Sequence, residues 1–181
     1  MSLASPPPLA YQPIDHTPDP KLDLLLERHV DVSPALVWDA WTKPDLIRRW
    51  FTPAPWRTVE CKIDLRPGGV FRTVMESPEG ERFPGDGCYL EIVPQRKLVW
   101  TSALLPGYRP VNPAGTNDAR KPCAEFLFTA VIAMAPQGNG TRYSALAIHT
   151  DHDSCKRHME MGFHDGWGKA LDQLVTLMKG T

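Results

Sequence analysis

The chain has 181 residues and a mass of 20.3 kDa, which is enough for one domain with a short tail. Lysine and arginine together number 20 and aspartate and glutamate 21, so the net charge is −1, which argues against a broad nucleic-acid-binding surface or an anionic-membrane binder. No apolar run approaches the roughly 20 residues that a membrane-spanning helix needs.

Residues 1–20 are predicted to be a flexible tail, and residues 21–181 a single domain. Six of the 19 prolines lie in this tail, and proline suits neither a helix interior nor the middle of a sheet. The tail has no lysine, arginine or apolar core and therefore does not resemble a secretory signal. The cysteines at positions 61, 88, 123 and 155 form no C-x-x-C pair. We therefore expect a cytoplasmic protein with reduced thiols.

A strand and two short helices are predicted to open the domain. Apolar residues alternate over Leu22–Val30, as in a strand with one buried face. Ser33–Pro34 then provides an N-cap and a proline for the first helical turn. Lys43–Pro44 predicts a second helix, which the prolines from Pro53 onward end.

The middle of the chain is predicted to form an antiparallel meander. Period-two patterns separated by turn residues predict strands, and these cover residues 56–65, 70–77, 87–93, 97–105, 124–134 and 141–150. Segment 136–140, Pro-Gln-Gly-Asn-Gly, is a strong hairpin signal. The long connection 106–122 is predicted to be either a lid or binding loop, or a surface insertion.

A long helix is predicted to close the chain, from about Ser154 to Lys179. At about 100° per residue, its inward face is apolar in the C-terminal half. In the N-terminal half, Arg157, Glu160 and His164 share that face with apolar residues. This mixture is typical of a helix that covers a cavity with a polar mouth.

This order of elements predicts an α+β fold. A curved antiparallel sheet would wrap around the long C-terminal helix, with two short helices after the first strand, so that both apolar faces are buried. Such a sheet can leave a hollow between itself and the helix.

Several segments resemble a known superfamily. The element order and Ser33–Thr42 are similar to the START-like helix-grip superfamily, often labelled SRPBCC. Arg49–Pro53, Asp64–Phe71 and Gly162–Leu174 resemble one of its families, the bacterial proteins similar to the C-terminal domain of the activator of heat-shock-protein-90 ATPase. The resemblance covers about residues 22–179.

The resemblance implies a deep, mostly apolar cavity between sheet and helix. Members of the superfamily bind lipids, hormones and polyketides, some are aromatases or cyclases, and some bind a chaperone. We therefore expect the protein to bind a small hydrophobic or amphipathic ligand in an internal cavity, with no cofactor.

Two alternatives stay open. The first is a cofactor-independent cyclase, dehydratase or hydrolase that uses a cavity histidine as general acid or base. The second is a chaperone-interacting module. With a leader of only about twenty residues, we do not expect the separate N-terminal domain of full-length activators.

The candidate polar residues lie on the closing helix. His164 would be the acid or base of an enzyme, assisted by Glu160, because an imidazole exchanges protons near neutral pH. In a binding protein, Arg157, Glu160 and His164 would orient the ligand. The alternatives are a core histidine and a solvated ion pair between Arg157 and Glu160.

The candidate lining of the cavity is apolar and largely aromatic, as ligand pockets usually are. Together with Arg157 and His164, the predicted ligand contacts are Trp50, Phe51, Phe71, Met75, Trp100, Phe128, Met161 and Trp167. Plain core packing is the alternative for Trp50 and Phe51.

A metal site is not expected, although His149, His152, Cys155 and His158 recur at every third residue. These residue types bind zinc, but structural sites usually have closely spaced ligand pairs, and this run spans a strand end and a helix start.

Gly162 and Gly166 are expected on the outward face of the closing helix, where each glycine costs about 1 kcal/mol relative to alanine. Either close approach by a second chain, in a homodimer, or local flexibility would explain them.

Overall fold

The computed structural model of the chain describes residues 16–112 and 126–180. Most of the predicted tail, residues 113–122 of the long connection and the start of the strand predicted at 124–134 lie outside these ranges. In chain order the elements are β1 Asp23–Val30, α1 Pro34–Thr42, α2 Pro44–Trp50, β2 Arg57–Ile63, β3 Val70–Glu76, β4 Arg82–Val93, β5 Lys97–Thr101, β6 Leu104–Leu105, β7 Arg109–Pro110, β8 Phe128–Gln137, β9 Gly140–His149, α3 His152–Glu160 and α4 Phe163–Lys179.

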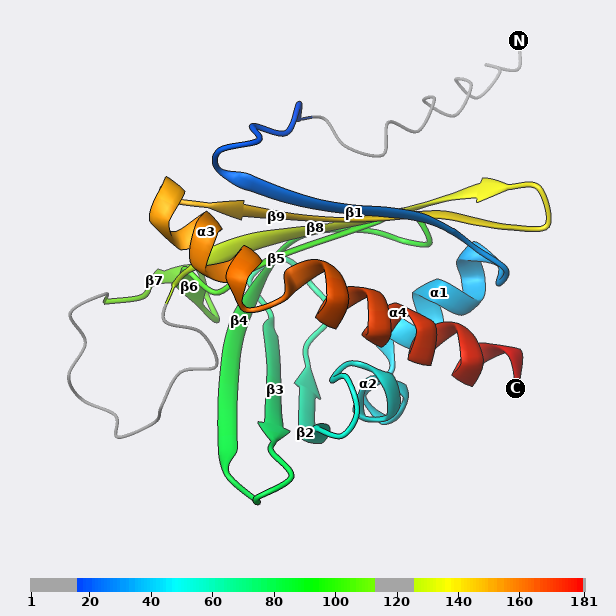
Figure 1. Ribbon diagram of the computed structural model, residues 1–181, viewed down its shortest axis with the longest axis horizontal. Coiled ribbons are helices and arrows are strands. Elements are labelled where there is room, and N and C mark those ends of the chain that lie inside the picture. Colours follow the sequence, from blue (N-terminus) through cyan, green and yellow to red (C-terminus); the bar gives the residue numbers. More distant parts are fainter. Residues whose placement is uncertain (1–15, 113–125, 181) are drawn as a thin grey trace, which may run out of the picture.

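Seven strands form one sheet in the order β1-β9-β8-β5-β4-β3-β2, and every neighbouring pair is antiparallel. In Figure 1, β1, β9 and β8 run in a different direction from β4, β3 and β2, and α4 lies across the angle between these two halves. The predicted α+β helix-grip fold is confirmed. None of the helices within the described ranges is long and apolar enough to cross a membrane.

Local sequence signals explain most element boundaries. The Ser33 side chain accepts a hydrogen bond from the backbone N–H of Leu36 (3.4 Å), and Pro34 is the first residue of α1, as predicted. Gly138 has a φ of 57° in the turn that joins β8 to β9, where Gln137 pairs with Gly140. Glycine adopts positive φ without steric cost, so the predicted hairpin forms there.

The short helices α1 and α2 pack into one end of the sheet. Val37 and Ile47 are fully buried, and the Trp50 indole donates a hydrogen bond from Nε1 to the Ala40 carbonyl (2.9 Å). The rings of Trp41 and Trp50 lie edge to face, with centroids 4.8 Å apart. The packing of Trp41 against Trp50 holds Phe51 and the following loop close to α4.

The strand predicted at 97–105 is shorter than expected. β5 ends at Thr101, because Ser102 turns to bond Phe128: its backbone N–H donates to the Phe128 carbonyl (3.0 Å), and its Oγ accepts from the Phe128 N–H (3.0 Å). The chain then forms the small β6–β7 pair.

The prediction of a single closing helix at 154–179 is wrong, because the helix is interrupted at Gly162, which separates α3 from α4. Gly162 has a φ of 89°, and no side-chain or backbone atom lies within 4 Å of where a Cβ would stand. The glycine is therefore needed for its backbone conformation rather than for a close neighbour. Its N–H donates to the Met159 carbonyl (3.0 Å) as α3 ends, and its carbonyl accepts from the Gly166 N–H (2.7 Å) as α4 begins.

The break changes which residues face inward. On α3 the buried residues are Ser154, Cys155 and His158. On α4 they are Phe163, Ala170, Leu171, Leu174 and Met178. The polar residues that α3 turns inward are therefore Ser154 and His158, and not the predicted set of Arg157, Glu160 and His164.

Candidate ligand cavity

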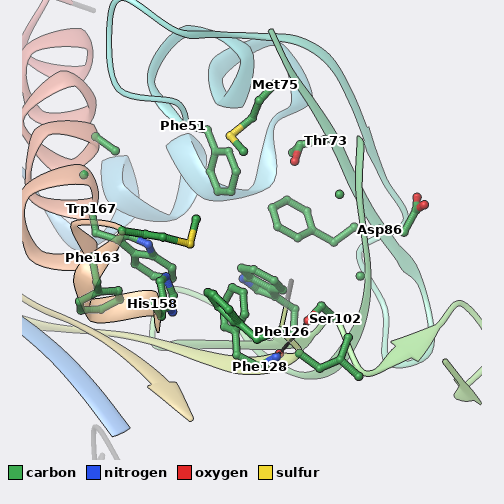
Figure 2. A pocket seen from close by; sticks show the side chains of 18 of the residues that line it. Phe51, Thr73, Met75, Asp86, Ser102, Phe126, Phe128, His158, Phe163 and Trp167 are labelled. Carbon is green, nitrogen blue, oxygen red and sulfur yellow. Dashed lines mark hydrogen bonds between the residues drawn. The ribbon is translucent and has the colours of Figure 1, made fainter. Parts of the chain in front are cut away.

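A cavity of about 980 Å³ lies between the sheet, the α2–β2 connection and the two C-terminal helices. In Figure 2, Phe51 and Met75 lie at one end, Phe126 and Phe128 at the other, and His158, Phe163 and Trp167 on the helix side. A volume of this size is at the upper end of the range of roughly 300–1,000 Å³ that is typical of small-molecule sites.

Most of the wall is apolar and aromatic. On β3, the alternate residues Phe71, Thr73 and Met75 all line the cavity, as the period of a strand requires. The Phe71 ring contacts those of Phe51 and Trp100, with centroids 5.6 and 5.0 Å away. Because these rings pack against one another, the wall is held in place without a ligand.

Polar groups gather where β9 passes into α3. The lining residues there are Thr150, Asp151, Ser154 and His158. Asp151 caps α3, because its Oδ1 accepts from the Ser154 backbone N–H (2.8 Å) and its Oδ2 from the Ser154 hydroxyl (3.1 Å). The backbone N–H of Ser154 is the largest cause that holds the pKa of Asp151 below its usual range. This end of the cavity therefore carries a fixed negative charge.

The most unusual feature of the polar end is a buried pair of histidines. His158 Nδ1 lies 2.9 Å from His149 Nε2, and His149 Nδ1 lies 2.9 Å from the Leu22 carbonyl oxygen. The two side chains come from α3 and β9, and the carbonyl precedes β1. Both histidines are buried, with 5% of His149 and 8% of His158 exposed.

Burial lowers the pKa of both imidazoles. For His158 the loss of hydration, followed by repulsion from His149, lowers the pKa to about 4. For His149 the loss of hydration also lowers the pKa, although the Leu22 carbonyl and the carboxylates of Asp23 and Asp151 act in the opposite direction. Both rings are therefore neutral at neutral pH.

At the other end of the cavity, Asp86 is paired with a cation. Arg72 on β3 donates from its guanidinium to Asp86 on β4, with 2.6 Å between Nη1 and Oδ1. Both side chains are partly exposed. The pair therefore forms a polar, solvent-exposed edge of the cavity and is not a charge buried inside it.

All of the predicted ligand contacts except Arg157 and His164 line the cavity. The predicted inward positions of His164, Glu160 and Arg157 are wrong, because the break at Gly162 turns these residues outward. His164 is exposed, with its Nε2 3.2 Å from the Leu25 carbonyl oxygen of β1. Glu160 is exposed and forms an ion pair with Lys156 (3.8 Å), and Arg157 is exposed as well.

Sequence reasoning missed His158 and Ser154 as site residues, and His149 as the partner of His158. In the sequence, His158 is distinguished only as one of the possible zinc ligands that recur at every third residue. Among the described residues, no three His, Cys, Asp or Glu side chains are grouped to hold a metal ion. His152 is exposed and lies against the Lys21 carbonyl, whereas Cys155 packs into a buried cluster with Leu24 and Phe163. Of the four residues in that spacing, His149 and His158 are the two whose side chains meet.

Comparisons with known proteins agree with this fold. The chain matches the family model described as "Activator of Hsp90 ATPase homolog 1-like protein" over residues 31–179. None of the curated proteins matches the chain.

Solved structures extend the comparison. Protein NE0264 from Nitrosomonas europaea is 46% identical, with a TM-score of 0.81, over 90% of this chain and 97% of that one. A protein from Rhodobacter sphaeroides is 18% identical, with a TM-score of 0.73, over 91% of this chain and 97% of that one, and shares the fold. Because the family model spans nearly all of the sheet and both C-terminal helices, the chain belongs to the activator of Hsp90 ATPase homolog 1-like family, within the START-like helix-grip (SRPBCC) superfamily.

Proposed function

We propose that the protein binds a small apolar or amphipathic molecule in the cavity between sheet and helices. The observation that supports this most strongly is the cavity itself, which has about 980 Å³ of space, aromatic walls and one polar end. Affinity would come mainly from burial of apolar surface, at about 25 cal/mol per Å², and the polar groups would orient the ligand.

The chemistry of the histidines favours binding over acid–base catalysis. A general acid or base works best when its pKa is near the working pH. Burial lowers the pKa of His158 to about 4, so this imidazole is a weak base at neutral pH and holds no extra proton to donate. His164, the candidate for an enzyme, lies outside the cavity lining.

The proposal also places the protein in the cytoplasm, which the free thiols of Cys61, Cys88 and Cys155 support. Cys123 lies outside the described residues. A homodimer and a chaperone partner stay predictions. Gly162 no longer supports the homodimer, because its positive φ explains that glycine without a second chain.

Native mass spectrometry of the freshly purified protein, before and after denaturation, tests the proposal. We expect an extra mass that is released on unfolding and that fragmentation identifies as an apolar or amphipathic compound. If the ligand is absent from the expression host, the same experiment is repeated after addition of para-phenylphenol, whose two rings fit a cavity of this size.

Two matched variants locate the binding. Met75→Trp places a bulkier ring in the cavity wall on β3, whereas Met159→Trp makes the same change at an exposed α3 residue outside the lining. We expect the bound mass to decrease in Met75→Trp and to persist unchanged in Met159→Trp. Equal retention in both variants, or no binding of any compound by the wild-type protein, would contradict the proposal.

A further inference from the structure

The hydrogen bonds of the histidine pair fix where each proton lies. A backbone carbonyl only accepts, so the Leu22 oxygen requires a proton on His149 Nδ1. In a neutral imidazole the other nitrogen is then an acceptor, and His149 Nε2 accepts from His158 Nδ1. His158 must therefore carry its single proton on Nδ1, which leaves Nε2 with a free lone pair.

The free nitrogen of His158 is carried by a residue that lines the cavity. Nε2 lies on the side of the ring opposite the His149 contact, and it has no hydrogen-bond partner among residues 16–112 and 126–180. His158 lines the cavity, and the rings of Phe126, Phe128 and Phe163 surround its imidazole. These three phenyl rings offer no hydrogen bond, and no residue of the described ranges donates to Nε2, so a guest in the cavity or a water molecule is left to satisfy it.

We propose that His158 Nε2 selects ligands that carry a neutral hydrogen-bond donor, such as a phenol or alcohol on an apolar body, and that His149 and the Leu22 carbonyl set its tautomer for this purpose. This inference rests on the proposed function, because it specifies the chemical class of ligand for the same cavity. The ligand hydroxyl donates to Nε2, and no proton is transferred.

The same geometry disfavours an anionic head group. A carboxylate placed against Nε2 would meet a lone pair rather than a proton. It would also approach the carboxylate of Asp151, which lines the same end of the cavity. An acid with the same apolar body should therefore bind more weakly than the phenol.

Three probes with one apolar body test the selection: para-phenylphenol, its methyl ether para-methoxybiphenyl, and para-phenylbenzoate. Isothermal titration calorimetry near neutral pH measures each dissociation constant. A site that loses its hydrogen bond typically loses about tenfold or more in affinity. We expect the wild-type protein to bind the phenol about tenfold tighter than the ether, and tighter than the benzoate.

Variants assign the selection to His158. His158→Phe keeps an aromatic ring but removes the acceptor, so the phenol should lose its advantage over the ether while the ether keeps its own affinity. His158→Gln, whose amide oxygen can accept from the ligand, should restore part of the preference. His152→Phe changes an exposed histidine of the same helix outside the lining and should leave the preference intact.

Nitrogen NMR gives a second measurement that does not depend on the variants folding. In the wild-type protein, both histidines should be neutral with the proton on Nδ1, and addition of para-phenylphenol should shift the Nε2 resonance of His158. A proton on His158 Nε2 would overturn the inference.

The calorimetric outcomes separate the two proposals. Equal affinity for phenol and ether, or tighter binding of the benzoate, would overturn the inference and leave the proposed function standing. If none of the three probes binds, the proposed function fails and the inference fails with it. A preference for the phenol that survives in His158→Phe would overturn the assignment to His158.

Discussion

The His158 imidazole is surrounded by rings rather than by water. The ring centroids of Phe126, Phe128 and Phe163 lie 4.8, 5.1 and 5.1 Å from it. A charged imidazole would lose its hydration there, and this loss lowers the pKa of His158. The same loss lowers the pKa of the neighbouring His149, and the nearby carboxylates of Asp23 on β1 and Asp151 at the start of α3 do not compensate for it. The burial that makes His158 a steady hydrogen-bond acceptor at neutral pH also makes it sensitive to acid.

We expect this sensitivity to appear in the free energy of unfolding. The pKa of His158 is lowered to about 4 by burial, whereas an unfolded histidine titrates near 6.5. Between these values the unfolded chain binds more protons than the folded one, so stability falls as the pH falls from about 6.5 towards 4, by about 3 kcal/mol for a shift of this size. Urea unfolding at a series of pH values measures this decline.

His158→Phe is the direct comparison, since it removes the group that resists protonation. This variant should lose less stability over the same pH window than the wild-type protein does. His29→Gln changes an exposed histidine bonded to the Gln137 carbonyl and should follow the wild-type curve. Parallel curves for His158→Phe and the wild type would show that His158 is not the source of the acid sensitivity.

Among the elements, the α3–α4 break depends on one glycine. A side chain at a φ of 89° meets its own backbone, so Gly162→Ala should lower the free energy of unfolding by about 1 kcal/mol or more. Gly168→Ala is the matched control inside α4, where no atom lies within 4 Å of the added Cβ. That change should raise stability by up to about 1 kcal/mol, because alanine is the better helix former. If both changes were stabilising in urea unfolding, α3 and α4 would be one continuous helix.

The same glycine shows which parts of the molecule the sequence could predict. The strands followed from period-two patterns, and α1 followed from Ser33 and Pro34, because these signals act between near neighbours. Glycine within an amphipathic helix is ambiguous, since it can be tolerated there or can end the helix. Treating Gly162 as tolerated produced a straight helix and placed His164 inward.

The histidine pair needed information that no local pattern holds. His149 and His158 meet only because the end of β9 lies against the buried face of α3, and the Leu22 carbonyl joins them through the pairing of β1 with β9. Their spacing was visible in the sequence, but the tautomer depends on this three-dimensional contact. Strand alternation puts Phe71 and Met75 on one face of β3, but it does not say which face lies inside.

A single side chain joins α4 to the end of α2. The Gln173 amide donates to the carbonyls of Trp50 and Thr52 (both 2.9 Å), and its Oε1 accepts from the Ala54 N–H (2.9 Å). Gln173→Leu should destabilise the fold by about 1–3 kcal/mol, because these backbone groups lose their partner. Asp172→Ala changes the neighbouring residue of α4 and breaks its exposed ion pair with Arg28 of β1, which should cost less than about 1 kcal/mol. Equal effects in urea unfolding would show that the Gln173 contacts are no stronger than a surface pair.

Across the whole molecule, the cavity lies within one continuous core. The large cluster around Ile47, Leu98 and Leu171 and the smaller cluster of Leu24, Ala147, Cys155 and Phe163 share Leu26, Phe128 and Trp167 as packing neighbours. Two of these shared residues, Phe128 and Trp167, also line the cavity. Part of the wall that would hold a ligand therefore also connects the two clusters.

We expect unfolding to be a single transition that a ligand shifts as a whole. Tryptophan fluorescence and far-ultraviolet circular dichroism should give the same midpoint, since both clusters unfold together. At a hundredfold excess over its dissociation constant, para-phenylphenol should stabilise the folded state by about 2.7 kcal/mol and raise both midpoints equally. Met75→Trp should reduce this increase, and Met159→Trp should retain it in full. Two separate transitions, or a midpoint that rises by fluorescence alone, would mean that the cavity wall is not part of one cooperative core.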